Sequence, residues 1–162
     1  MFSGPRSIVD RLTRDRRSRL MAAVRGTNTV PEIVVRRVVH GMGFRYRLHD
    51  AHLRGKPDLV FPRLRAIILV HGCFWHGHTC RWGRTPKSNQ GFWDDKRATN
   101  RKRDKRVIAA WRRDGWRVLV VWGCQVRDSE GLKSRLLAFF EGRPSNISLS
   151  RLRPMAANEI KN

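Results

Sequence analysis

A short segment near the middle of the chain is dense in side chains that bind metals. Cys73, His76, His78 and Cys80 lie close together, and Cys124 follows the apolar run WRVLVVW. Zinc prefers thiolate and imidazole ligands in a tetrahedral shell, and three cysteines with one histidine are a common structural set. We therefore predict a structural zinc site made of all three cysteines and one loop histidine. The spacing alone does not decide between His76 and His78, and three buried free cysteines are the ordinary alternative.

A second group of residues has the types needed to hydrolyse a phosphodiester. This reaction needs a metal-held water or hydroxide, neutralised charge at phosphorus and help for the leaving oxygen. Asp58 follows a proline at the start of a strand and suits a hard cation, while His71 ends the next strand near His76. One carboxylate and two histidines at one strand edge are enough to bind a metal and a phosphate and to activate a water. The alternatives are a turn residue for Asp58 and structural roles for the histidines.

The composition indicates a polyanionic partner. The 162 residues include 35 Lys and Arg against 13 Asp and Glu, which gives a formal net charge of +22. A field this positive repels itself, and nucleic acid is the natural counterpart, although a solvated arginine-biased surface is an alternative. We expect no membrane association, because no long apolar run or lipidation motif is present. An odd number of cysteines and no apolar region typical of a signal peptide lead us to expect a cytoplasmic protein.

The elements that must position these residues are predicted from apolar patterning and turn signals. The run Ala66–Val70 is long and apolar enough for a central strand buried on both faces, and residues 71–91 are expected to form a loop. Thr29 and Glu32 form a capping box whose side chains are expected to satisfy free N–H groups at a helix start. The predicted helices are 11–25, about 30–41, 93–114 and 132–140, and the predicted strands are 44–48, 59–61, 66–70 and 116–122.

Strands interspersed with helices predict an α/β fold with a mixed sheet. The length suits one domain, which we place at residues 1–142. Residues 143–162, rich in Pro, Ser and Asn, are expected to form a flexible tail.

Three motifs closely resemble those of the very-short-patch repair (Vsr) endonucleases. They are GKPD at 55–58, VHGCFWH at 70–76 and GWRVLVVW at 115–122, within a resemblance that covers about residues 15 to 125. Members of this family are bacterial enzymes that nick DNA beside a thymine mispaired with guanine, a lesion left by deamination of 5-methylcytosine. The resemblance implies a restriction-endonuclease-like α/β core with a mixed central β-sheet flanked by helices. It also implies a monomer that acts on double-stranded DNA carrying a T:G mismatch, with the mismatch-repair machinery considered as a further partner.

The resemblance implies two metals with separate ligands. Asp58 would be the principal ligand of a catalytic magnesium ion, the backbone carbonyl of Val70 would be its second ligand, and Glu32 would assist through water. Where the family commonly has threonine, this chain has Val70, so any role of a hydroxyl is lost there. Glu32 has an alternative role in the capping box. The implied ligands of the structural zinc are Cys73, His78, Cys80 and Cys124.

The resemblance also implies how the histidines work. His71 would contact the region of the reacting phosphate, and His76 would act as general base or position the attacking water. Asp104 would pair with the catalytic histidine, although it has an alternative partner in Arg101, three residues earlier on a basic helix. Gly77 and Thr79 stand where the family often has histidines, and neither is needed for the zinc shell.

Aromatic residues near the site are candidates for contact with DNA bases. Phe74, Trp75 and Trp93 are predicted in polar surroundings, where rings presented from loops can stack on or wedge between bases, most easily at a mismatch. In the family the matching aromatics intercalate beside the T:G pair, and the residue matching Met21 approaches from the minor groove. Core packing is the alternative for all four. Phosphate contacts are expected from the basic helix that carries Lys96, Arg97, Arg101, Lys102, Arg103, Lys105 and Arg106.

The sequence therefore predicts a magnesium-dependent DNA endonuclease, a phosphodiester hydrolase, that nicks one strand beside a T:G mismatch. Two alternatives remain. One is a related nuclease with a different DNA substrate. The other is a zinc-stabilised DNA-binding module without catalysis, which Val70 alone favours and which the retained Asp58, His71 and His76 oppose.

Overall fold

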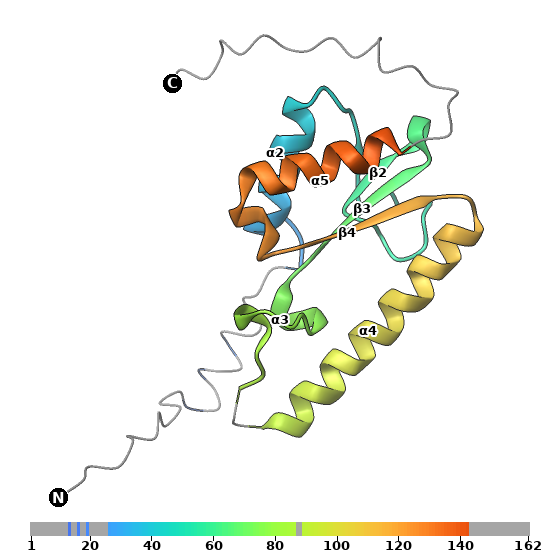
Figure 1. Ribbon diagram of the computed structural model, residues 1–162. Helices are drawn as coiled ribbons and strands as arrows, with labels where there is room; N and C mark the ends of the chain where they lie inside the picture. Colours follow the sequence, from blue (N-terminus) through green and yellow to red (C-terminus); the bar gives the residue numbers. More distant parts are fainter. Residues whose placement is uncertain (1–12, 14–15, 17–18, 20–25, 87–88, 143–162) are drawn as a thin grey trace, which may run out of the picture.

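A four-stranded mixed sheet forms the centre of the protein (Figure 1). The computed structural model describes residues 26–86 and 89–142, together with three residues nearer the N-terminus. The strands β1 (Arg47–Leu48), β2 (Leu59–Phe61), β3 (Ala66–His71) and β4 (Arg117–Trp122) lie side by side in chain order. The first three pair antiparallel, and β4 pairs parallel to β3.

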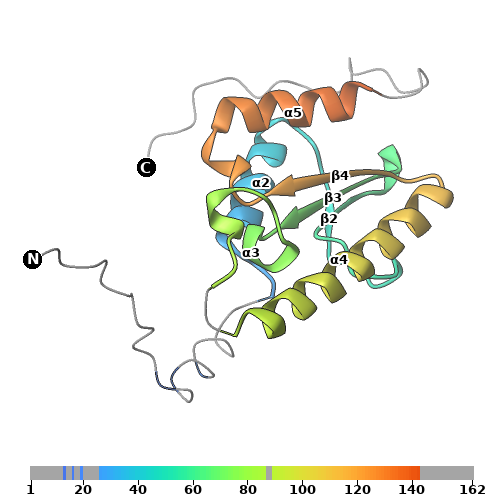
Figure 2. The same ribbon diagram turned by 60° about the horizontal axis from the view of Figure 1, so that its bottom comes forward.

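Helices cover both faces of this sheet. The helices α2 (Val30–Gly41) and α5 (Ser129–Glu141) pack on one face, and α4 (Gln90–Arg113) lies on the other. Figure 2 shows α5 above the strands and α4 below them. The prediction of an α/β fold with a mixed central sheet flanked by helices is confirmed. No helix in the part of the chain that the structure describes is long and apolar enough to cross a bilayer.

Alternation along β3 decides which side chains meet which helix. Ala66, Ile68 and Val70 belong to the apolar cluster that includes α2 and α5, whereas Ile67 and Leu69 pack with Trp111 of α4. Successive strand side chains point to opposite faces, so His71 continues the face that looks toward α4. The fold therefore directs a histidine at the end of the central strand toward the basic helix.

Several predicted boundaries differ from the structure. The first strand, predicted at 44–48, covers only Arg47–Leu48. Phe44 packs in the core instead, where its ring stacks on Phe140 with centroids 3.9 Å apart. The segment 71–91, expected to be a loop, contains the short helix α3 (Cys73–His76) and a 3₁₀ turn at Arg81–Gly83. The helix expected at 93–114 begins earlier, at Gln90, and the last helix begins at Ser129.

The predicted capping box was wrong in part. Glu32 accepts a hydrogen bond from the N–H of Asn28 (2.9 Å), but the hydroxyl of Thr29 donates to Glu32 (2.9 Å) and caps no helix N–H. The carboxylate attracts the hydroxyl because a charged acceptor gives the stronger hydrogen bond. The predicted helix at 11–25, including Met21, lies almost entirely outside the described residues, and so does the tail at 143–162.

Candidate functional site

Three cysteines and one histidine meet beside the end of the sheet. The donor atoms of the set all lie within 4.8 Å of one another, and its members are Cys73, His78, Cys80 and Cys124. Zinc–sulfur bonds of about 2.3 Å in a tetrahedron put sulfur atoms roughly 3.8 Å apart, so a small contraction brings this set to zinc geometry. Between the two histidines that the spacing left open, His78 lies in this group and His76 does not.

Backbone N–H groups link three of these residues, Cys73, His78 and Cys124. Cys73 begins α3, and its carbonyl accepts the N–H of His78 (2.9 Å) after Gly77 has turned the chain in the left-handed region (φ 69°). The N–H of Cys124 donates to Sγ of Cys73 (3.2 Å), which ties the segment after β4 to the start of α3. A hydrogen bond with His78 lowers the pKa of Cys80 to about 6, whereas burial raises the pKa of Cys73 to about 12. A cation held between the thiols would favour the thiolate form of both.

A second cluster contains His71, His76 and Asp104, whose donor atoms also lie within 4.8 Å of one another. The two imidazole rings stack with centroids 3.9 Å apart and planes 11° apart. Nδ1 of His76 pairs with Oδ2 of Asp104 at 2.5 Å, and Asp104 also accepts from Arg103 (3.1 Å). Because Asp104 holds Nδ1, Nε2 is the nitrogen of His76 left for proton transfer.

Burial sets the ionisation of this cluster. It lowers the pKa of His71 to about 4, and the neighbouring His76 adds to that shift, so the His71 ring is uncharged near neutral pH. Burial alone would raise the pKa of Asp104, but the hydrogen bond and charge of His76 outweigh it and the pKa is lowered. A neutral ring and an ionised carboxylate thus lie on either side of His76.

Two further carboxylates face the same cavity, which has a volume of about 270 Å³. Asp58 precedes β2, and Glu32 lies in the first turn of α2. Burial raises the pKa of Asp58, opposed by a hydrogen bond from the N–H of Val70 and reinforced by the negative charge of Glu32. Two neighbouring carboxylates suit a hard cation, since oxygen ligands are those that magnesium prefers.

The carbonyl of Val70 faces the same side of its strand as Asp58. Along β3 the peptide groups alternate between the two neighbouring strands. The carbonyl of His71 accepts the N–H of Gly123 after β4 (2.9 Å), whereas the N–H of Val70 donates to Oδ2 of Asp58 (2.7 Å). The N–H and C=O of one strand residue point the same way, so the Val70 carbonyl is directed past the end of β2 toward Asp58. The valine side chain packs in the core on the α2 face and leaves this carbonyl unaffected.

Glu32 belongs both to the start of α2 and to the lining of the cavity. Only 3% of its surface is exposed, and its carboxylate accepts hydrogen bonds from Asn28, Thr29 and Arg36, each at 2.9 Å. It also lines the cavity beside Asp58. Glu32 therefore anchors the start of α2 and adds negative charge to the cavity.

The predicted DNA-contacting aromatics form one cluster. Phe74 and Trp75 of α3 contact each other edge to face at 5.1 Å, and both contact Trp93 of α4, at 5.1 and 6.1 Å. Trp93 lies near the start of α4 and is buried, rather than in the polar surroundings that the sequence suggested. Phe74 and Trp75 are half-buried and rest on it. The neighbouring Phe92 is 54% exposed at the rim of the cluster.

The sequence reasoning missed Trp122 and Asn100, and it gave Arg103 only a role in phosphate contact. Trp122 packs edge to face on His71 (5.4 Å) and stacks on His78 (4.4 Å), so one indole touches both clusters. Its place opposite His71 in the β3–β4 register, directly before the segment that carries Cys124, is the signal that would have found it. Arg103 pairs with Asp104, and Asn100 donates to the carbonyl of Trp75 (2.9 Å). Neither stands out in a helix so rich in polar residues.

Comparison with known proteins identifies the family. The model of the family described as DNA mismatch endonuclease Vsr matches residues 9–82. The type II nicking enzyme V.XorIIP of Xanthomonas oryzae pv. oryzae is 50% identical over 129 residues, which are 80% of this chain and 95% of that protein. The DNA mismatch endonuclease Vsr of Escherichia coli K12 is 39% identical over 121 residues, 75% of this chain and 78% of that protein.

The similarity extends to a solved structure. The catalytic domain of the homing endonuclease I-Bth0305I matches with a TM-score of 0.47 and 20% identity, over 70% of this chain and 96% of that chain. The close relatives described above identify the class as DNA endonuclease. The chain belongs to the Vsr DNA mismatch endonuclease family, as its motifs predicted.

Proposed function

We propose that this protein is a magnesium-dependent endonuclease that nicks one strand of DNA beside a T:G mismatch and so starts very-short-patch repair of deaminated 5-methylcytosine. The observation that carries the proposal is the convergence of Asp58, His71, His76 and Asp104 on one cavity. A binding module without catalysis has no use for such a set. The relative named as a mismatch endonuclease supports the substrate, and a monomer acting in the cytoplasm is part of the proposal.

The carboxylate of Asp58 and the carbonyl of Val70 would hold the magnesium ion, with Glu32 acting through water. When bound, magnesium neutralises charge on the phosphate and lowers the pKa of a coordinated water. The thiols and His78 would hold zinc, which would fix α3 and with it the position of His76 relative to His71.

The histidines would divide the proton chemistry between them. Nε2 of His76 takes the proton of the attacking water, because Asp104 pairs with Nδ1 and stabilises the imidazolium that forms. His71 is uncharged near neutral pH and donates a hydrogen bond from its ring to the reacting phosphate. The stacked geometry of the rings keeps both nitrogens on one cavity.

The test compares DNA substrates. Purified protein with magnesium is incubated with matched duplexes and with duplexes that carry T:G in varied sequence contexts, and the cut positions are mapped. We expect one nick beside the thymine and none in matched DNA. Asp58→Ala should lower the nicking rate by about 10³-fold or more and leave DNA binding largely intact, because the metal acts mainly on the transition state.

Three outcomes would contradict the proposal. Cutting of matched and mismatched DNA alike would mean a related nuclease with another substrate. Tight binding without any cut would mean a DNA-binding module. Undiminished nicking by Asp58→Ala would remove Asp58 from the chemistry.

A further inference from the structure

A second cavity, of about 490 Å³, lies on the other side of the histidine pair. It runs between α4 and β4, whereas the first cavity opens toward α2 and the start of β2. Among the residues that the structure describes, three line both cavities: His71, His76 and Asp104. The histidine pair therefore stands at the junction of two spaces.

The two cavities have opposite charge. The first is lined by three carboxylates, Glu32, Asp58 and Asp104, against two cations, Lys56 and Arg103. The second is lined by Asp104 and by four exposed cations: Arg101, Lys105, Arg112 and Arg135. We call the second cavity, defined by these four cations, the basic groove. Within the described ranges 26–86 and 89–142, none of the four has an ion-pair partner. Asp104 is the acidic residue of the groove, and its carboxylate is hydrogen-bonded to His76 and Arg103.

Local backbone geometry brings Arg101 close to the histidines. Gly77 ends α3 with φ 69°, a conformation that favours glycine, and a Cβ there would overlap the guanidinium of Arg101. The arginine thus lies against the backbone directly after His76. A positive charge at this distance suits a phosphate next to the reacting one.

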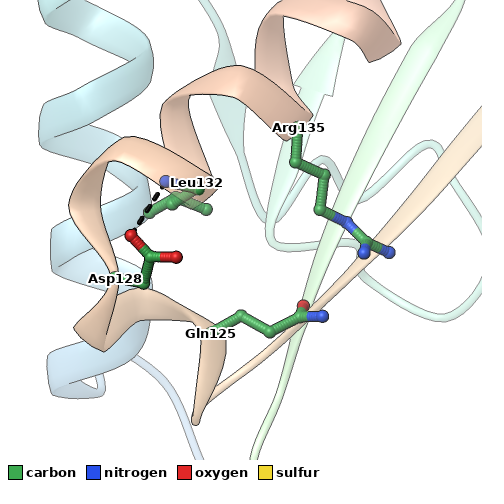
Figure 3. A pocket seen from close by; sticks show the side chains of 5 residues that line it. Gln125, Asp128, Leu132 and Arg135 are labelled. Atoms are coloured by element: carbon green, nitrogen blue, oxygen red, sulfur yellow. Dashed lines mark hydrogen bonds between the residues drawn. The ribbon is translucent and has the colours of Figure 1, made fainter.

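The exposed edge of β4 borders the groove, and two of its backbone groups are hydrogen-bonded to side chains. Gln125 accepts the N–H of Trp122 (2.9 Å), and Arg135 donates to the carbonyl of Val120 (3.3 Å). Figure 3 shows both side chains extending over β4, Arg135 from α5 and Gln125 from the turn that follows the strand. These contacts use two of the outward backbone groups that a docking strand would need. Arg135 keeps further N–H donors for an anion.

We propose that the basic groove binds one or two phosphate groups of the cleaved strand, on the side of the reacting phosphate that faces away from Asp58. The proposal rests on the proposed function, since it needs a phosphate held at the histidine pair. A DNA strand carries one negative charge about every 3.4 Å along the helix axis, so neighbours of the reacting phosphate must lie close to this junction. The four unneutralised cations give those neighbours a complementary surface.

The test scans the backbone with uncharged phosphates. T:G duplexes with a single methylphosphonate at successive positions of the nicked strand are bound without added magnesium, so that the strand stays intact. In the wild type, we expect about tenfold weaker binding at one or two adjacent positions on one side of the nick. Lys105→Ala/Arg112→Ala should weaken binding to the normal duplex and remove that position dependence. It should also reduce the slope of log Kd against log salt by about 2.

The matched control is Lys133→Ala/Arg113→Ala, which removes the same charge from exposed residues outside the groove. It should keep the position dependence of the wild type. If both double variants behave alike, or if the groove variant remains sensitive at the same phosphates, the groove binds no specific phosphate and the proposal is wrong. A wild type that nicks T:G duplexes but shows no sensitive position overturns this proposal alone, whereas a wild type that nicks no duplex overturns the proposed function.

Discussion

Two histidines only two positions apart face different clusters. His76 is the last residue of α3 and pairs with Asp104, whereas His78 follows the left-handed turn at Gly77 and meets the cysteines. Spacing alone could not separate them, because the turn depends on backbone geometry that has no periodic signal. Asp58 and His71 were easier to find, since each flanks a strong apolar strand.

The separation of the histidines predicts opposite phenotypes for two alanine variants. His76→Ala should lower nicking by at least about 10²-fold, the range of general-base catalysis, and keep its zinc and its thermal stability. His78→Ala should lose zinc and stability together. Zinc content by mass spectrometry, melting temperature and nicking rate check both variants. The reverse pattern would show that the two roles are exchanged.

The buried His71 predicts a pH dependence of stability. Its folded pKa of about 4 is below the ordinary value of 6.5, so the unfolded chain binds more protons between these pH values. Stability should therefore fall as the pH drops from 6.5 to 4, by up to about 3 kcal/mol from this residue.

Urea unfolding at several pH values checks this dependence. His71→Gln should reduce the acid loss, and His52→Gln, which changes an exposed histidine outside the site, should not. Equal pH slopes in wild type and His71→Gln would disprove the assignment.

At the scale of elements, the sequence predicted the central strand and the long basic helix better than the connections. The run from Ala66 is apolar throughout and became β3, and the helix expected at 93–114 became α4. The helix α3 was missed because its four residues are too few to show a period. Phe44 looked like a strand residue, but its partner Phe140 lies far along the chain, and such pairings are invisible to local patterns.

The link between α3 and the end of β4 predicts that zinc stabilises the fold. Metal analysis should find about one zinc per chain, and Cys124→Ser should lower the melting temperature by roughly 10 °C or more. Cys124 sits after β4 and contacts Cys73 at the start of α3, so its loss unlinks two elements. A metal-free preparation with an unchanged melting temperature would refute the zinc site.

The aromatic cluster of α3 predicts where mismatch discrimination arises. Trp75→Ala should slow cutting of the T:G duplex, because it raises the activation free energy by about 1–3 kcal/mol, the range for one stacked base. It should barely change the weak binding to matched DNA. A fluorescent base analogue beside the T:G pair should brighten with wild type and less with the variant.

Trp82→Ala is the control, because Trp82 is exposed outside this cluster. Trp75 is a core residue instead if Trp75→Ala weakens binding to matched and to mismatched DNA equally, or if the variant protein does not fold.

At the scale of the whole molecule, the charge of +22 gives affinity without selectivity. A T:G wobble pair leaves the phosphates nearly where a matched pair has them, so both duplexes attract the protein equally. Composition alone predicted nucleic acid as the partner, because the net charge follows from the sequence without knowledge of the fold. The location of the charge in a groove beside the histidines required the structure.

The shared electrostatic attraction predicts a salt dependence that is common to both substrates. Raising the salt from 50 to 200 mM should weaken binding to matched and to T:G duplexes by about 10³-fold each if six or more phosphates are contacted. The ratio between the two affinities should stay within about threefold. A ratio that collapses in high salt would place the discrimination in phosphate contacts instead of base contacts.

The sheet separates most of the apolar residues that keep this protein folded from the basic helix α4. The larger apolar cluster lies toward α2 and α5, while α4 presents a nearly continuous polar surface on the opposite face. Substitutions on the outside of α4 remove little apolar packing, and surface changes of this kind usually alter stability by under about 0.5 kcal/mol. An enzyme built in this way is evolvable. Its affinity for the DNA backbone can change in small steps through folded intermediates, and a library randomised on the outside of α4 would sample different phosphate contacts with few losses to misfolding.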